Sequence, residues 1–112
     1  MSVETTTAFD LDGVVATQTS SPFPVLGSEI AIVLDVVSAI TGTSPTLDLT
    51  VEYSANGVTW TAPTVTQAMS QVTTTAAMET KRFSPEGSQV RLVATIGGTG
   101  DYEFTANIVH FS

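Results

Sequence analysis

The chain has 112 residues, and its 3 Lys and Arg against 11 Asp and Glu give a formal net charge of -8 at pH 7. We expect a single domain covering residues 1–112, and no nucleic-acid partner, because phosphate binding depends on Lys and Arg. No apolar run reaches the roughly 18 residues of a membrane span, and the first residues lack the basic and apolar blocks of a signal peptide. The absence of Cys excludes disulfides, thiolate zinc sites and a Cys nucleophile.

Charged residues make up only 12% of the chain, about half the usual share of ~25%. Thr, Val, Ala and Ser replace them, and these are β-forming or small residues. A polar but weakly charged surface opposes association less than a charged one does. The composition therefore hints at a protein that works packed against neighbours.

The front of the chain predicts two weak strands, 3–11 and 14–19, on either side of a turn at Asp12-Gly13. Residues 1–8 are interpreted in two ways. They form an extended arm that adds to the sheet of a neighbouring subunit, or they are a frayed terminus.

Extended geometry continues at 22–24, where two prolines fix φ and bias the preceding residues. The run 29–38 is largely apolar on both alternating faces, which is typical of a central strand or one covered on both sides. After turn-forming residues at 41–45, residues 47–53 alternate strictly between apolar and polar. That pattern predicts a half-buried antiparallel strand.

The second half of the chain begins with Asn56-Gly57, a pair that favours a type I′ hairpin because both residues accept a positive φ. The region 63–84 has no firm period, and we expect a loop, with a strand possible at 64–66, before a strand ending at Arg82-Phe83. Turns at 85–88 and 97–100 then precede two further predicted strands, 89–96 and 102–109.

Seven or eight short strands with turn signals every 8 to 12 residues, and no amphipathic helix of ten residues, indicate an all-β protein. The expected architecture is a single antiparallel β-sandwich, jelly-roll-like in its connections.

Asp10 and Asp12 lie in a sequence, FDLDGVV, that matches the first motif of haloacid-dehalogenase-type phosphatases. That chemistry requires a Lys, further acidic residues for Mg²⁺ and a parallel α/β scaffold, and this chain shows no α/β alternation. Ca²⁺ bound by the same two carboxylates is a second interpretation, although no further acid is near enough to complete a set. A solvated turn explains both residues, and we expect no catalytic, cofactor-binding or metal-binding residue.

His110 is the sole histidine, and no elbow motif surrounds any Ser. Trp60, close to the Asn56-Gly57 turn, either stacks on a sugar or caps the core or an interface. Tyr53 and Tyr102 lie on the apolar faces of their strands, so we expect core positions with the hydroxyls reaching the rim.

Partner contacts are expected at two places besides Trp60. Val3 and Thr5 lie within the arm, where a strand edge is able to template pairing. Lys81 and Arg82 are adjacent and form most of the basic set, so they either set the docking register on an acidic partner or are a solvated strand end.

The stretch 29–108 resembles a family of small structural proteins of tailed phages. It shares with them a succession of turns and strands rather than a set of chemical groups. The matching segments are Thr41-Gly42-Thr43-Ser44-Pro45, Leu47-Asp48-Leu49-Thr50-Val51, Ser54-Ala55-Asn56-Gly57-Val58-Thr59-Trp60, Arg82-Phe83, Arg91-Leu92-Val93-Ala94-Thr95, Gly97-Gly98-Thr99 and Phe104-Thr105.

This resemblance implies a virion component, and most specifically a non-enzymatic head decoration (cement) protein on the capsid surface, assembled in the host cytoplasm. Its partner is then the major capsid protein, and self-association as a trimer is favoured. The hairpin with Trp60 is also similar to discoidin-like sugar-binding sandwiches. The alternative functions are therefore a carbohydrate-binding module of a tail or baseplate, with a glycan as partner, or another head or tail component.

Overall fold

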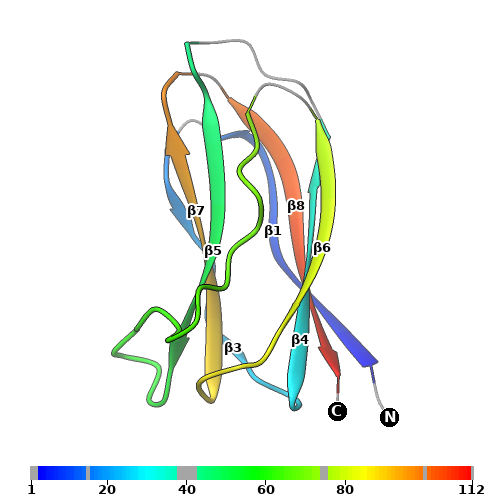
Figure 1. Cartoon of the computed structure of the whole chain (residues 1–112), viewed down its shortest axis with the longest axis vertical. Coiled ribbons are helices and arrows are strands. Elements are labelled where there is room, and N and C mark those ends of the chain that lie inside the picture. Colours follow the sequence, from blue (N-terminus) through cyan, green and yellow to red (C-terminus); the bar gives the residue numbers. More distant parts are fainter. Residues whose placement is uncertain (1–2, 15, 38–42, 74–75, 100, 112) are drawn as a thin grey trace.

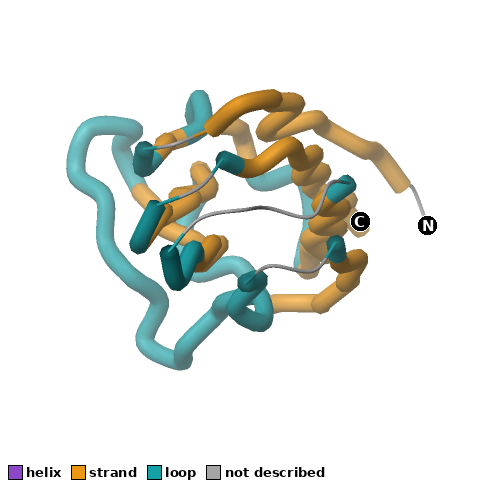
Figure 2. The backbone as a smooth tube through the Cα atoms, turned by 90° about the horizontal axis from the view of Figure 1, so that it is seen from above, coloured by secondary structure: helices purple, strands orange, loops and turns teal. Residues whose placement is uncertain are grey.

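The computed structural model describes residues 3–14, 16–37, 43–73, 76–99 and 101–111. Within these ranges, eight β-strands form two antiparallel sheets that pack face to face (Figures 1 and 2). The expected all-β sandwich of seven or eight strands is confirmed. In the same ranges, no helix has the length and hydropathy needed to cross a bilayer.

The two sheets divide the strands between them. Sheet A contains, in spatial order, β1 (Val3–Val14), β8 (Tyr102–Phe111), β4 (Glu29–Val36) and β6 (Ala77–Phe83). Sheet B has β7 (Gln89–Gly97) at its centre, with β5 (Thr46–Ser54) on one side and, on the other, β2 (Gln18–Thr19) and β3 (Phe23–Pro24).

An irregular segment, residues 61–73, lies along the free edge of β5, and we call it the strap (Figure 1). Isolated bridges join it to β5 at three pairs of residues, which are Tyr53 with Thr61, Thr50 with Ala68, and Leu47 with Val72. If β2 and β3 are taken as one interrupted strand and the strap as a fourth, each sheet has four members. Successive members then alternate between the sheets in most of the connections, which is the order of a jelly roll.

Strict alternation places the core between the sheets. On β5 and β8 nearly every second residue is buried, because successive side chains of a strand point to opposite faces. Phe9 of β1 packs edge-on against Phe104 of β8, with ring centroids 5.6 Å apart. The central position expected for the 29–38 run is confirmed, since β4 lies between β8 and β6. Its inner face is buried, whereas Val33 and Asp35 on its outer face remain half-buried.

The turn predicted at Asp12-Gly13 is wrong. Residues 3–14 form one strand, and the register of β1 against β8 shifts between Leu11 and Val14. Gly13 has a φ of 67°, so its conformational freedom serves a bulge within the strand instead of a turn between two strands.

The type I′ hairpin predicted at Asn56-Gly57 is also wrong. Of these two residues only Gly57 has a positive φ, 77°, and β5 is followed by the irregular strap. Ser54 and Asn56 organise the turn instead. The Ser54 hydroxyl accepts from the backbone N–H of Gly57 at 2.8 Å, and the Asn56 side-chain oxygen accepts from that of Val58 at 2.8 Å.

In the region 63–84, the strand expected to end at Phe83 is confirmed as β6. No strand forms at 64–66, which belongs to the strap.

Candidate interaction surfaces

Asp10 and Asp12 are both exposed on β1. Asp10 lies in register with Thr105 of an antiparallel neighbour, so these carboxylates do not stand at the end of a parallel strand as phosphatase chemistry requires. The described residues contain no group of three or more His, Cys, Asp or Glu side chains that could hold a metal ion.

His110 is only 2% exposed and faces the core near the end of β8. Its Nε2 lies 3.4 Å from the Thr6 hydroxyl of β1, and its Nδ1 is buried without a hydrogen-bond partner in the described structure. Burial lowers the pKa of His110, and the negative charge of Glu4 partly offsets that effect. The geometry is that of a neutral histidine packed in the core.

Two buried tyrosines anchor the strap. The Tyr53 hydroxyl donates to the side-chain oxygen of Gln67 at 2.6 Å, and the Gln67 amide donates to the Ser84 carbonyl at 2.9 Å. The Tyr102 hydroxyl donates to the Thr73 carbonyl at 2.8 Å. The predicted core positions of both tyrosines are confirmed, but their hydroxyls bond to the strap instead of reaching an open rim. Burial raises the pKa of both phenols above its usual value.

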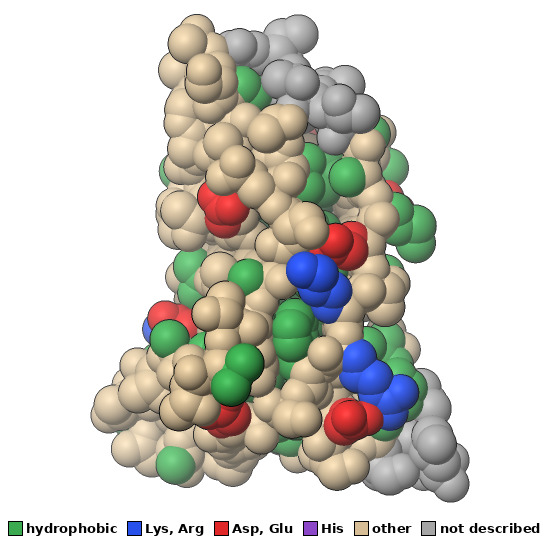
Figure 3. Space-filling view, viewed as in Figure 1, with side chains coloured by type: hydrophobic (Ala, Val, Ile, Leu, Met, Phe, Trp, Pro, Cys, Tyr) green, Lys and Arg blue, Asp and Glu red, His purple; other side chains and the backbone are tan. Residues whose placement is uncertain are grey.

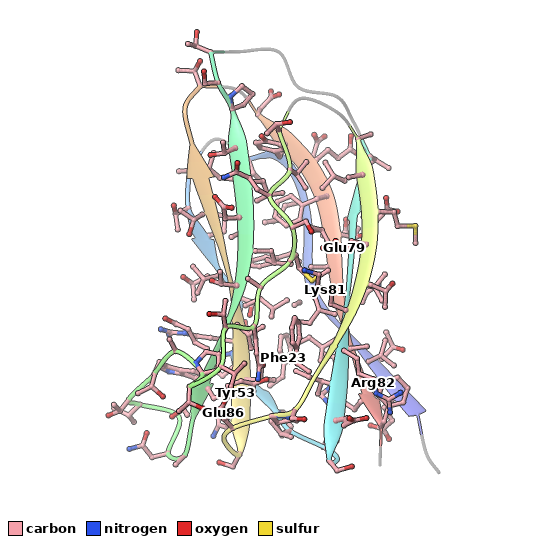
Figure 4. All side chains as sticks on the ribbon, viewed as in Figure 1. Phe23, Tyr53, Glu79, Lys81, Arg82 and Glu86 are labelled. Atoms are coloured by element: carbon pink, nitrogen blue, oxygen red, sulfur yellow. The ribbon has the colours of Figure 1, made fainter. Side chains whose placement is uncertain are left out.

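Two carboxylates hold the strap: Glu79 from β6, and Glu86 from the turn after β6, close to Tyr53 (Figure 4). Glu79 accepts from the backbone N–H and the hydroxyl of Ser70, each at 2.7 Å. Glu86 accepts from the same two groups of Thr64, at 3.0 and 2.8 Å. These hydrogen bonds favour the charged form, so the pKa of each carboxyl lies below its usual value.

Lys81 and Arg82 do not form one basic spot, because adjacent residues of β6 point to opposite faces. Lys81 points towards the strap and donates to the Ala68 carbonyl at 3.2 Å, whereas Arg82 lies on the other side of β6 (Figure 4). The Arg82 guanidinium forms an ion pair with Glu29 and lies 4.3 Å from the ring centroid of Phe111. Both cations are therefore engaged within the chain.

Trp60 lies beside the outer face of sheet B, where the Arg91 guanidinium stacks 4.5 Å from the centroid of its ring. Glu52 fixes that guanidinium with two contacts, at 2.8 Å to Nε and 2.7 Å to a terminal nitrogen. Trp60 is half-buried and is not part of the described core. A hollow of about 230 Å³ beside the Asn56 turn does not include Trp60 in its lining.

The register of sheet A brings some of the predicted contact residues together. One cross-strand row on its outer face runs Thr5, Val109, Ala31 and Arg82, and Val3 is paired with Phe111 at the end of the sheet. Lys81 faces the strap and Trp60 lies on the other sheet, so neither belongs to this row. That any of the five contacts a partner remains a prediction.

Within the segment 1–8, for which the sequence allows an arm or a frayed terminus, residues 3–7 are paired with 107–111 of β8. Sequence reasoning missed two features of the sheet edges. One is the strap, whose only signal was the pair of tyrosines on apolar strand faces. The other is the position of β1 at the end of sheet A, which follows from topology.

No protein-family model matches the chain, and no curated protein is significantly similar in sequence. The crystal structure of the PBSX exported protein XepA is similar with a TM-score of 0.68 and 15% identity, over 97% of this chain and 37% of that chain. Dimeric latent PorU from Porphyromonas gingivalis has a TM-score of 0.45 and 13% identity, over 96% of this chain and 12% of that chain.

The similarity to XepA shows the fold, and that to PorU is too low to support an argument. The chain spans about 37% of the length of XepA. The class that fold and surfaces define is an antiparallel β-sandwich of jelly-roll type, with its described polar groups mostly engaged in holding the fold together.

Proposed function

We propose that the protein is a non-enzymatic structural component of a phage virion. In the more specific form of this proposal it is a head decoration (cement) protein that bridges subunits of the major capsid protein at the capsid surface, as a trimer. The role is adhesion, and its effect is to stabilise the shell by favouring the docked state through mass action.

The observation that carries this proposal is the way the few charges are used. All three cations of the chain have partners within it: Lys81 at the Ala68 carbonyl, Arg82 at Glu29 and Arg91 at Glu52. The outer face of sheet A carries Thr, Ala, Val and Asn side chains together with Met78 and Phe111. Its charged groups are the Arg82–Glu29 ion pair and the carboxylates of Asp10, Asp35 and Glu103. Figure 3, which shows the strap side of the molecule, shows that Lys and Arg side chains lie next to Asp or Glu side chains. The uncharged part of this face loses little solvation energy when another protein covers it.

The similarity in fold to XepA, a phage-related protein, supports the phage context. The succession of motifs between residues 29 and 108 supports it independently, because that resemblance is to small structural proteins of tailed phages.

The experiment mixes the purified protein with expanded capsids that lack a decoration protein, and measures co-sedimentation and the temperature at which the capsids release their contents. We expect saturable binding and a higher release temperature. Mature capsids that do not bind the protein, or an unchanged release temperature at saturation, would contradict the proposal. Unexpanded capsids are the matched control, because their subunits are arranged differently.

The carbohydrate-binding alternative depends on Trp60, and no specific contact favours it. One face of the Trp60 ring is covered by Arg91, and the nearby hollow does not reach the ring. A glycan array with the wild-type protein and a Trp60→Ala variant tests it. Binding lost in a folded variant would favour the alternative over the capsid role.

A further inference from the structure

The edges of the two sheets differ in how they are protected. An exposed strand edge presents unpaired N–H and C=O groups, and natural proteins usually cover it, shorten it or place Lys or Pro in it. The sandwich has four such edges: β1 and β6 in sheet A, β5 and the β2–β3 side in sheet B.

Three of these edges are protected. The strap forms backbone hydrogen bonds with β5 at Leu47 and Tyr53. The same strap lies beside β6, through the contacts of Glu79 and Lys81. The remaining edge of sheet B has only two-residue strands, and its second strand ends in Pro24.

The fourth edge, β1, is open. β1 has 12 residues, whereas strands typically have about 5 or 6, and it contains neither Lys nor Pro. Bulges also protect strand edges, but the two register shifts of β1 lie beyond Thr7 and leave residues 3–7 regular. Among the described residues, its strand pairing is with β8 alone, and no other backbone hydrogen bond reaches residues 3–14. Residues 3–7 form a regular stretch before the first shift of register, and Thr5 and Thr7 within it are exposed.

The negative charge of this edge favours some binding partners over others. Glu4, Asp10 and Asp12 are exposed along β1, which has no basic residue. Two copies of β1 paired through this edge would bring two sets of these carboxylates together without any basic residue between them, and like charges repel. An extended segment carrying Lys or Arg would instead form opposite-charge pairs with the same carboxylates.

From this we infer that the free edge of β1 is a docking site for an extended basic segment of a partner protein, which adds to sheet A as a fifth strand. Backbone hydrogen bonds along residues 3–7 supply the affinity, and Glu4 and Asp10 supply the preference for basic residues. The inference rests on the proposed adhesive role and specifies the surface and the chemistry of the partner.

The first test uses hydrogen exchange by NMR on the whole protein with an acetylated peptide of alternating Lys and Val, about eight residues long. We expect the peptide to slow the exchange of alternate amides within residues 3–7 at submillimolar to millimolar concentration. A peptide of alternating Glu and Val is the control and should leave them unchanged. Slowing by both peptides, by neither, or only at the strap would overturn the inference.

The second test compares two double variants that change the net charge equally. Glu4→Lys/Asp10→Lys reverses the charges of the edge, whereas Asp48→Lys/Asp101→Lys reverses two carboxylates away from it and from the outer face of sheet A. We expect the edge variant to weaken binding of the Lys-Val peptide and of expanded capsids by about tenfold or more relative to the control variant. An equal loss in both variants indicates a general charge effect and contradicts a docking site at β1.

The measurement of capsid binding distinguishes a failure of this inference from a failure of the proposed function. If wild-type protein and the edge variant bind capsids equally, the inference fails and the proposed function stands. If the peptide slows hydrogen exchange of the β1 amides in the wild-type protein, but this protein does not bind capsids, the proposed function fails and the edge site stands.

Discussion

The two sides of the sandwich differ in whether their strand edges are covered. On one side the strap covers the edges of β5 and β6, held by Tyr53, Glu79 and Lys81. On the other side β1 ends sheet A without a further neighbour among the described residues. A chain this weakly charged closes one side with an irregular segment and leaves the other available. The comparison indicates that the closed side serves stability and the open side serves contact.

The largest expected effect is on the closed side, at Gln67. It is 7% exposed and links the Tyr53 hydroxyl to the Ser84 carbonyl, so Gln67→Leu removes two hydrogen bonds and leaves buried polar groups unpaired. We expect the free energy of unfolding, measured by urea denaturation, to fall by about 3 kcal/mol.

Gln71→Leu is the matched control on the same strap, because Gln71 is exposed and bonds only to the Asp48 carboxylate. It should change the free energy of unfolding by less than about 0.5 kcal/mol. Equal effects of the two variants would show that the buried link does not hold the closed side.

The next effect concerns His110, buried beside β1 on the open side. Its pKa in the folded protein is lowered from 6.5, so between the two values the unfolded chain binds a proton that the folded chain does not. Stability is therefore complete above pH 6.5 and falls as the pH drops below it, with a slope of at most about 1.4 kcal/mol per pH unit.

His110→Gln should remove this dependence between pH 7 and pH 5, as measured by thermal unfolding across that range. Glu4→Gln should extend the fall to lower pH, because the Glu4 charge raises the pKa of His110. A pH dependence that is identical in wild-type protein and His110→Gln would mean that the histidine takes up its proton freely in the fold.

A smaller effect is expected at the strap carboxylates. The pKa values of Glu79 and Glu86 lie below 4.5 in the folded protein, so the stabilisation that these groups give is present above pH 4.5 and is lost as the pH falls through the folded values. Hydrogen exchange of the Ser70 and Thr64 amides should then accelerate on acidification more than the intrinsic rate predicts.

Glu79→Gln/Glu86→Gln should show fast exchange of these amides already at neutral pH, with little change in global unfolding, since both carboxylates are at the surface. If the Ser70 and Thr64 amides are as protected in this variant as in the wild-type protein, the tyrosine hydrogen bonds alone hold the strap in place.

The smallest effect is expected on the open side. Glu4 and Asp10 are exposed and take part in no described side-chain hydrogen bond, so Glu4→Lys/Asp10→Lys should change the free energy of unfolding by less than about 0.5 kcal/mol. Urea denaturation measures it. A large loss of stability would show that these carboxylates hold the fold, contrary to a role in contact.

Strict alternation made β5, β7 and β8 predictable, because each has one face on the core and one in solvent. The strap was not predictable, since its residues have no period of their own and it is held by isolated bridges and side-chain hydrogen bonds instead of a continuous strand ladder. The bulge at Gly13 was misread for a related reason. A glycine with positive φ serves a turn or a bulge equally well, and only pairing with β8 distinguishes them.

The candidate contact residues were predictable only in part. Thr5 and Arg82 are far apart in the sequence, and only the register of four strands puts them in one row. Adjacency in sequence suggested that Lys81 and Arg82 act together, and the alternation of β6 separates them.

The most direct measurement is residue-resolved hydrogen exchange on the free protein, comparing the two sides. The amides of Leu47, Tyr53 and Val72, which are bonded between β5 and the strap, should exchange slowly. Alternate amides of residues 3–7 should exchange at nearly unprotected rates, because they point away from β8. Uniform protection along β1, equal to that of the strap amides, would show that this edge is already occupied and would contradict an open side.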